Sequence, residues 1–207
     1  MYKLMPLNYE YNALEPYISA FTINIHYNKH YQKYLKKLND TLNSLKYDYR
    51  YNLVDLITHI DEFPLADRDT ILYNAGGVLN HELYFSNISP NKNNQPTGKL
   101  KEAIDKKYGS FDNFKNEFIK TSGYLTGSGY TFLVLNKNEL DIINTSNQDT
   151  PYLYGLIPIM SLDLWEHAYY LDYQNDKENY ILNFFEIVDF EVIGKLYEEN
   201  TQKNTLQ

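Results

Sequence analysis

Residues 157–170 read Ile-Pro-Ile-Met-Ser-Leu-Asp-Leu-Trp-Glu-His-Ala-Tyr-Tyr, an apolar run that passes directly into a polar and aromatic segment. The apolar residues 157–164 predict a buried strand, and the segment after them predicts the start of a helix. Asp163 and His167 stand four residues apart at this junction, so their side chains can converge on one ion. The alternative is an Asp that caps the helix beside a surface histidine.

Two neighbours of this pair favour the metal interpretation. Trp165 would form a dry wall beside the ion, and Glu166 would accept a hydrogen bond as an outer partner of a ligand. The stretch therefore predicts half of a metal site, and the remaining ligands must come from elsewhere in the chain.

A second set of candidates lies on a long helix predicted from Thr22, its expected N-cap, to Leu45, a stretch without Gly or Pro. His26, His30 and Tyr34 recur every four residues, so they share one face of that helix. The alternative is a core stripe of hydrogen-bonded imidazoles, since two histidines at this spacing are a weak metal signal.

A third candidate, His81, follows the glycine pair Gly76-Gly77 on a second long helix predicted from Arg68 to Ser86. Glycine inside a helix costs about 1 kcal/mol relative to alanine, so a pair indicates a group that needs the space, most simply one packed over Gly77. Simple close helix packing is the alternative. The last histidine, His59, has no such context and is expected to be exposed.

Three histidines and one carboxylate, drawn from both halves of the chain, thus make one possible ligand set: His26, His81, Asp163 and His167. Nitrogen and oxygen ligands of this kind suit iron, manganese or zinc. The chain has no cysteine, which excludes thiolate ligands and disulfides. Two rivals stay open: a mononuclear metal hydrolase or oxygenase, and a structural or coat protein that holds a metal with little turnover.

The remaining pattern predicts an α+β protein of two domains. A linker rich in turn-forming residues, 90–98, separates an N-terminal antiparallel helical hairpin, residues 1–90, from a C-terminal α/β domain, residues 91–207. The second domain is expected to hold a three-stranded antiparallel sheet flanked by helices. Its first two strands form a hairpin, its helices cover 99–107, 111–122, 178–185 and 189–199, and the last eight residues form a polar tail.

Composition narrows the function classes. The 207 residues carry 19 basic and 27 acidic side chains, a net charge of -8, which argues against nucleic-acid or membrane-surface partners. Hydrophobic residues make up 43%, so the chain should fold, and no stretch approaches the length of a membrane span. A soluble, cytoplasmic protein is expected.

In combination, the motifs are recognisable: over about residues 3–199 the chain resembles the iron/manganese superoxide dismutases. Four blocks carry the resemblance, namely His26-Tyr-Asn-Lys-His-Tyr-Gln-Lys-Tyr34, Asn74-Ala-Gly-Gly-Val-Leu-Asn-His81, Gly127-Ser-Gly129 with Asn147-Gln-Asp149, and Asp163-Leu-Trp-Glu-His-Ala-Tyr-Tyr170 continued by Leu-Asp-Tyr-Gln-Asn175.

The resemblance implies an antioxidant enzyme that disproportionates superoxide with one manganese ion per subunit, iron being possible. It makes His26, His81, Asp163 and His167 the metal ligands. It places His30 and Tyr34 as a hydrogen-bonded, proton-relaying pair at the gateway.

The resemblance also implies that Gln148 hydrogen-bonds the metal-bound solvent and fills the space above Gly77. That combination favours manganese over iron, and a site that works with both ions stays open.

Residues at the subunit interface follow from the same resemblance. Glu166 and Tyr170 are expected to reach across a homodimer, toward His167 and His30 of the partner subunit. The chain also departs from the family pattern at the positions Tyr27, Tyr31, Phe85, Tyr130, Phe132 and Asp176. The last change, with the net negative charge, leaves Lys29, Lys33 and Lys177 as candidates to attract the anionic substrate.

Overall fold

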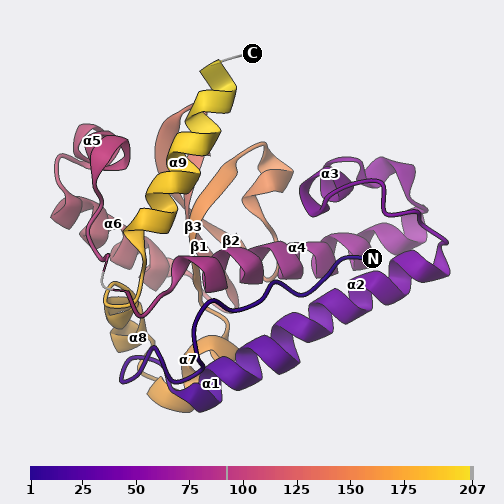
Figure 1. Cartoon of the computed structure of the whole chain (residues 1–207), viewed down its shortest axis with the longest axis horizontal. Coiled ribbons are helices and arrows are strands. Elements are labelled where there is room, and N and C mark those ends of the chain that lie inside the picture. Colours follow the sequence, from indigo (N-terminus) through magenta and orange to yellow (C-terminus); the bar gives the residue numbers. More distant parts are fainter. Residues whose placement is uncertain (92, 206–207) are drawn as a thin grey trace.

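The computed structural model describes residues 1–91 and 93–205 and has the expected α+β architecture. Two long helices, α2 (Gln32–Ser44) and α4 (Leu65–Asn87), run side by side as an antiparallel hairpin (Figure 1). Between them lie the short helix α3 (Leu53–Thr58) and the 3-10 turn η2 (Ile60–Glu62). The predicted N-terminal hairpin is therefore confirmed.

The first long helix begins earlier than predicted. Its first part, α1 (Ala20–Ile25), is capped by Ser19, whose hydroxyl accepts a hydrogen bond from the main-chain nitrogen of Thr22. The expectation that Thr22 caps the helix is wrong, because Ser19 stands in the cap position three residues before it and Thr22 lies in the first turn.

Between α1 and α2 the helix widens into one π-helical turn, η1 (His26–Tyr31). This turn carries the first two histidines of the stripe, and its side chains lie against α4 and against the short helix α7 (Glu166–Tyr173). Such π turns are often found at functional sites. The π-helical geometry alone therefore indicates that residues 26–31 belong to a functional site.

An N-terminal arm packs along the hairpin and is held by two of the tyrosines that depart from the family pattern. The hydroxyl of Tyr27 donates to the main-chain oxygen of Met5, and the hydroxyl of Tyr31 accepts from its main-chain nitrogen at 3.0 Å. Tyr31 also donates to Glu82 at 3.0 Å. These two tyrosines therefore anchor the arm at Met5 while their rings line the core.

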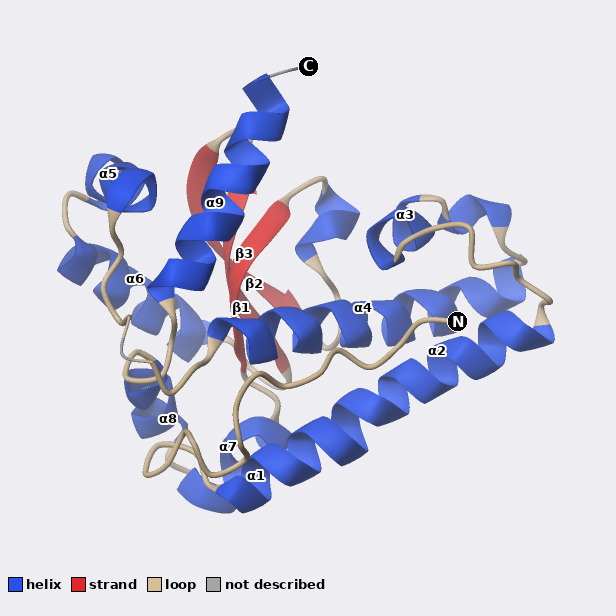
Figure 2. Cartoon of the chain, viewed as in Figure 1, coloured by secondary structure: helices blue, strands red, loops and turns tan. Residues whose placement is uncertain are grey.

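The C-terminal half holds the predicted three-stranded antiparallel sheet, and its strands lie in the order β2-β1-β3. Its strands are β1 (Gly129–Asn136), β2 (Glu139–Ser146) and β3 (Ile157–Asp163), and the 3-10 turn η3 (Pro151–Tyr154) precedes the third. Figure 2 shows the strands in red with helices beside them. Helices α4 and α9 contact β3, whereas α5 and α6 contact β2. The helices of this half not yet delimited are α5 (Gly98–Tyr108), α6 (Phe111–Tyr124), α8 (Lys177–Phe184) and α9 (Phe190–Thr205).

Helix α9 continues to Thr205, so the predicted end of this helix at residue 199 is wrong. The last two residues of the predicted polar tail, 206 and 207, lie outside the described part of the chain. Residues 200–205 contain no Gly or Pro, so the sequence has no helix breaker there. No helix among the described residues is long and apolar enough to cross a membrane.

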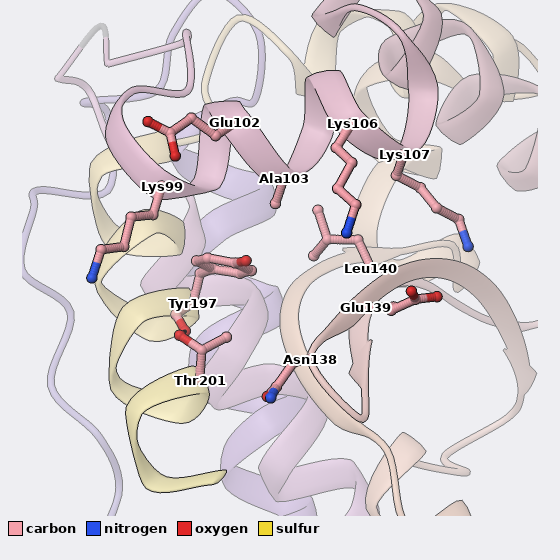
Figure 3. A pocket seen from close by; sticks show the side chains of 10 residues that line it. All are labelled: Lys99, Glu102, Ala103, Lys106, Lys107, Asn138, Glu139, Leu140, Tyr197 and Thr201. Carbon is pink, nitrogen blue, oxygen red and sulfur yellow. Dashed lines mark hydrogen bonds between the residues drawn. The ribbon is translucent and has the colours of Figure 1, made fainter. Parts of the chain in front are cut away.

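A surface pocket of about 550 Å³ lies between α5, α9 and the β1–β2 turn. Figure 3 shows the Tyr197 ring on its floor beneath Ala103, with Lys106 reaching toward Leu140. None of the four candidate ligands lines this pocket.

Candidate metal centre

All four candidate ligands converge at one point between the two halves. One donor atom from each of His26, His81, Asp163 and His167 lies within 4.8 Å of the others. Turn η1 supplies His26, α4 supplies His81, the end of β3 supplies Asp163 and the start of α7 supplies His167. The side chains of the first three are 0% exposed and that of His167 is 8% exposed. The four side chains therefore form one group of potential metal ligands, as the sequence hypothesis of a shared site requires.

Asp163 lies near all three imidazoles of the cluster. Its Oδ2 lies 3.1 Å from Nε2 of His26, 3.3 Å from Nε2 of His167 and 3.8 Å from Nε2 of His81. Its other oxygen, Oδ1, accepts a hydrogen bond of 2.9 Å from the main-chain nitrogen of Trp165. One carboxylate oxygen is thus fixed by the main chain, and the other faces the imidazoles.

The orientation of His81 is set by its own helix. Its Nδ1 lies 2.6 Å from the main-chain oxygen of Gly77, which has no hydrogen to donate, so Nδ1 carries the proton. The lone pair of the neutral ring is therefore on Nε2, a buried atom without a hydrogen-bond partner. A ring nitrogen prepared in this way is a typical metal ligand.

Burial also sets the charges. It lowers the pKa of His26 to about 4 and that of His81 well below its usual value, so both rings are neutral at physiological pH. Burial raises the pKa of Asp163, but the neighbouring His167 and His26 outweigh it and hold that pKa below its usual range. The neutral imidazoles of His26 and His81 beside an ionised carboxylate are in the protonation state that binds a metal, so these residues fit manganese or iron.

The space above the glycine pair is filled differently from the expectation. A Cβ on Gly77 would lie 2.6 Å from the ring of Tyr34, and a Cβ on Gly76 would lie 2.1 Å from the main-chain oxygen of Gln148. The expectation that Gln148 fills the space above Gly77 is therefore wrong. Adjacent helix residues point about 100° apart, so each glycine admits a different neighbour.

Tyr34 and Gln148 nevertheless meet. The Nε2 of Gln148 donates a hydrogen bond of 3.0 Å to the hydroxyl oxygen of Tyr34, whose ring lies 5.3 Å from that of His81. The amide of Asn80 lies 3.3 Å from the main-chain oxygen and 3.4 Å from the side-chain oxygen of Gln148. The glutamine is thus held between α4 and Tyr34.

His30 lies against the ligand cluster. Its ring stacks on His167, with 4.1 Å between the ring centres, and burial lowers its pKa to about 4. Among the described residues, no direct hydrogen bond joins His30 to Tyr34, whose hydroxyl oxygen accepts from Gln148. A direct proton relay between His30 and Tyr34 is therefore not formed within the chain.

Aromatic rings enclose the cluster. Phe85 lies 4.8 Å and Tyr84 5.3 Å from the ring of His26, and Trp165 stacks on His167 at 5.5 Å. Tyr130 and Phe132, two further departures from the family pattern, are fully buried on β1. The altered positions thus keep an aromatic wall.

Sequence reasoning missed one pair near the cluster. Tyr84 and Tyr180 are both buried, their hydroxyls lie 3.2 Å apart, and Tyr180 donates to the main-chain oxygen of Asp163 at 2.8 Å. Tyr84 lies three residues beyond His81, and Tyr180 is 96 residues beyond Tyr84. No periodicity links two such distant positions, so the sequence carried no signal for the pair.

The fold and cluster define a class: an α+β protein with a mononuclear nitrogen- and oxygen-ligated metal centre between a helical hairpin and a small sheet. Comparison with known families then identifies it. Residues 1–89 match the alpha-hairpin domain of the iron/manganese superoxide dismutases, and residues 96–196 match the C-terminal domain of the same family. The chain belongs to the iron/manganese superoxide dismutases.

Individual relatives agree with this assignment. The chain is 41% identical over 197 residues to "Superoxide dismutase [Mn/Fe] 2" of Staphylococcus aureus strain bovine RF122 / ET3-1. It matches the protein of the same name from strain Mu50 / ATCC 700699 to the same extent. In both comparisons the match covers 95% of this chain and 98% of the relative.

Proposed function

We propose that this protein is a superoxide dismutase, in which two superoxide anions and two protons give one oxygen molecule and one hydrogen peroxide molecule. The observation that carries the proposal is the buried cluster of three imidazoles and one carboxylate in a chain of this family. We assign His26, His81, Asp163 and His167 as the ligands of one manganese or iron ion. When bound, that ion supplies the electron exchange by alternating between its trivalent and divalent states.

The protein's own residues hold the proton that the product needs. Gln148 donates to the hydroxyl oxygen of Tyr34, so the hydrogen of that hydroxyl stays available for donation toward a substrate. Burial raises the pKa of Tyr34, which keeps the hydroxyl protonated. We therefore assign Tyr34 as the proton donor and Gln148 as the residue that orients it, and we place His30 beside the entrance.

Manganese is the ion we favour. Gly77 leaves α4 without a side chain at this position, and the amide of Gln148 comes instead from the loop after β2. A hydrogen-bonding amide beside metal-bound solvent changes the pKa of that solvent and thereby the redox potential of the ion. Both relatives are named for manganese and iron together, so activity with each ion is the natural comparison.

We further propose a homodimer. Glu166 and Tyr170 project from α7 next to His167, and both are exposed, Tyr170 at 49%. A second copy of the chain placed over α7 would cover them and close the entrance beside His30. The division into domains 1–90 and 91–207 and a cytoplasmic location are parts of the same proposal.

The rival functions have less support. A hydrolase or oxygenase needs room for an organic substrate, whereas the rings of Tyr84 and Phe85 lie within 5.3 Å of the His26 ring. A coat or structural protein needs no prepared proton donor, yet Tyr34 and Gln148 form one. A small anion is the substrate that fits so enclosed a site.

The test is a superoxide-disproportionation assay on metal-free protein reconstituted separately with manganese and with iron. We expect activity with manganese, and comparable activity with iron would identify a site that works with both ions. Bound metal in stoichiometric amount without activity for either ion would refute the proposed function.

A further inference from the structure

We propose that Tyr84 and Tyr180 form a two-hydroxyl bridge that positions the ligand Asp163 relative to α4, and that this bridge slows the loss of the metal. The inference rests on the proposed function only in taking Asp163 as a ligand. Both tyrosines lie outside the ligand set and outside the proton-donating pair of Tyr34 and Gln148. They act through Asp163, so they are positioning residues.

The direction of the bridge follows from counting hydrogens. A tyrosine hydroxyl has one hydrogen to donate, and Tyr180 donates it to the main-chain oxygen of Asp163 at 2.8 Å. In the 3.2 Å contact between the two hydroxyls, Tyr84 must therefore be the donor and Tyr180 the acceptor. Each donation polarises the next, so a chain from Tyr84 through Tyr180 to Asp163 is stronger than two separate bonds.

The bridge joins three elements, in addition to the hydrogen bond of 3.0 Å from the main-chain nitrogen of Ser161 on β3 to Asn87 on α4. Tyr84 lies on α4, one turn after the ligand His81, and its ring is 5.3 Å from that of His26. Tyr180 lies on α8, and Asp163 ends β3. A displacement of β3 away from α4 would separate Asp163 from His81 and would also break this bridge.

Two further hydrogen bonds fix Asp163 and the residue after it, and the bond from Tyr180 adds to them. Its Oδ1 accepts from the main-chain nitrogen of Trp165, and the next residue, Leu164, donates its main-chain N–H to Gly129 at 2.9 Å. Only Oδ2 is left to face the imidazoles. Without the Tyr180 bond, the peptide group of Asp163 could tilt and carry Oδ2 out of line.

The experiment compares manganese release from the reconstituted protein into excess chelator, at one temperature well below unfolding, for wild type and three variants. Tyr180→Phe removes the donor to Asp163 and should speed release by about tenfold. Tyr84→Phe leaves that donor in place and should speed it by about threefold. Tyr108→Phe is the control, because that buried hydroxyl on α5 has no hydrogen-bond partner and should not change release.

The double variant Tyr84→Phe/Tyr180→Phe tests whether the two hydroxyls act as one unit. Tyr180→Phe leaves the Tyr84 hydroxyl buried without its acceptor, so removing it as well should not speed release further. Multiplied effects would show two independent contributions and would overturn the bridge. Tyr180→Phe that lowers the unfolding midpoint but releases metal at the wild-type rate would also overturn it, since the role would then be structural only.

A second readout uses the metal-free protein and separates this inference from the proposed function. Amide hydrogen exchange at Leu164 and Trp165 reports on the Asp163 segment directly, and both amides should exchange faster in Tyr180→Phe than in wild type. If the wild type proves inactive with either metal, the proposed function fails while this comparison still decides the bridge. If Tyr180→Phe does not fold, unchanged exchange and unchanged release in Tyr84→Phe would overturn the inference.

Discussion

The ligand cluster and the rim beside it, formed by Glu166 and Tyr170, differ in burial and in where their contacts come from. His26, His81 and Asp163 are fully buried and are oriented entirely by contacts within the chain. Glu166 and Tyr170, one helical turn apart at the rim, are exposed, and their expected partners lie on a second copy. The difference leads us to propose that the single chain supplies all four metal ligands, whereas the rim is completed only in the proposed homodimer.

The largest expected effect on metal binding comes from removing one ligand of the buried cluster. His81→Ala removes a prepared imidazole and leaves Asp163 buried with fewer partners, so we expect metal binding and activity to be lost. Metal content measured after reconstitution and dialysis checks this. His59→Ala, at an exposed histidine of the same half, should keep full metal content. Full occupancy in His81→Ala would overturn the ligand assignment.

A smaller effect is expected at the junction between cluster and gateway. Gly77→Ala places a methyl group 2.6 Å from the ring of Tyr34, so the ring must move, and we expect a loss of about 1–3 kcal/mol in the free energy of unfolding. Gly123→Ala is the matched control, because nothing lies within 4 Å of its added methyl group. That control should gain about 1 kcal/mol from helix propensity. Equal changes from chemical denaturation would show that Tyr34 does not occupy the space above Gly77.

The exposed side of the comparison predicts an effect on assembly. Glu166→Ala should weaken the dimer by about tenfold, as expected for the loss of an interface charge pair, while the isolated chain still binds metal. Sedimentation at several protein concentrations measures the shift. Glu186→Ala, another exposed glutamate of the same half, should leave the association unchanged. A wild type that is monomeric at all concentrations would refute the proposed homodimer.

The smallest effect concerns the approach of the anionic substrate. Lys29 and Lys33 are exposed on the helix that carries His30, and Lys33 is close enough to contribute to the lowered pKa of that ring. Lys177 is a weaker candidate, because its Nζ donates to the main-chain oxygen of Leu125 at 2.9 Å. We expect Lys33→Gln to lower the rate about twofold at low salt, a difference that added salt removes. A difference that persists at high salt would argue against local steering.

Local patterns were sufficient to predict most of the fold. The hairpin helices, the three strands and their order along the chain follow from periodicity and turn residues, and the structure agrees with them. Ser19 and Thr22 are both capping residues one turn apart, so composition alone does not choose between them. The end of α9 is polar, and hydrophobic periodicity carries no signal there.

In the candidate site too, the residues that stand in local motifs could be predicted, whereas the contacts set by tertiary packing could not. The ligand set could be proposed because each histidine or carboxylate stands in a recognisable local motif. The neighbours of Gly76 and Gly77 could not be told apart, since both glycines satisfy the same pattern and only the rotation of α4 assigns Tyr34 to one and Gln148 to the other. Long-range pairs such as Tyr84 with Tyr180 depend on tertiary packing and leave no local pattern.

The most direct test of the central claim is an anomalous-diffraction map, recorded at the manganese absorption edge, from crystals of the manganese-reconstituted protein. The account predicts one strong peak per chain, which marks a manganese ion bound by Nε2 of His26, His81 and His167 and by Oδ2 of Asp163. A peak at any other place, or no peak among these four residues in an active preparation, would contradict it.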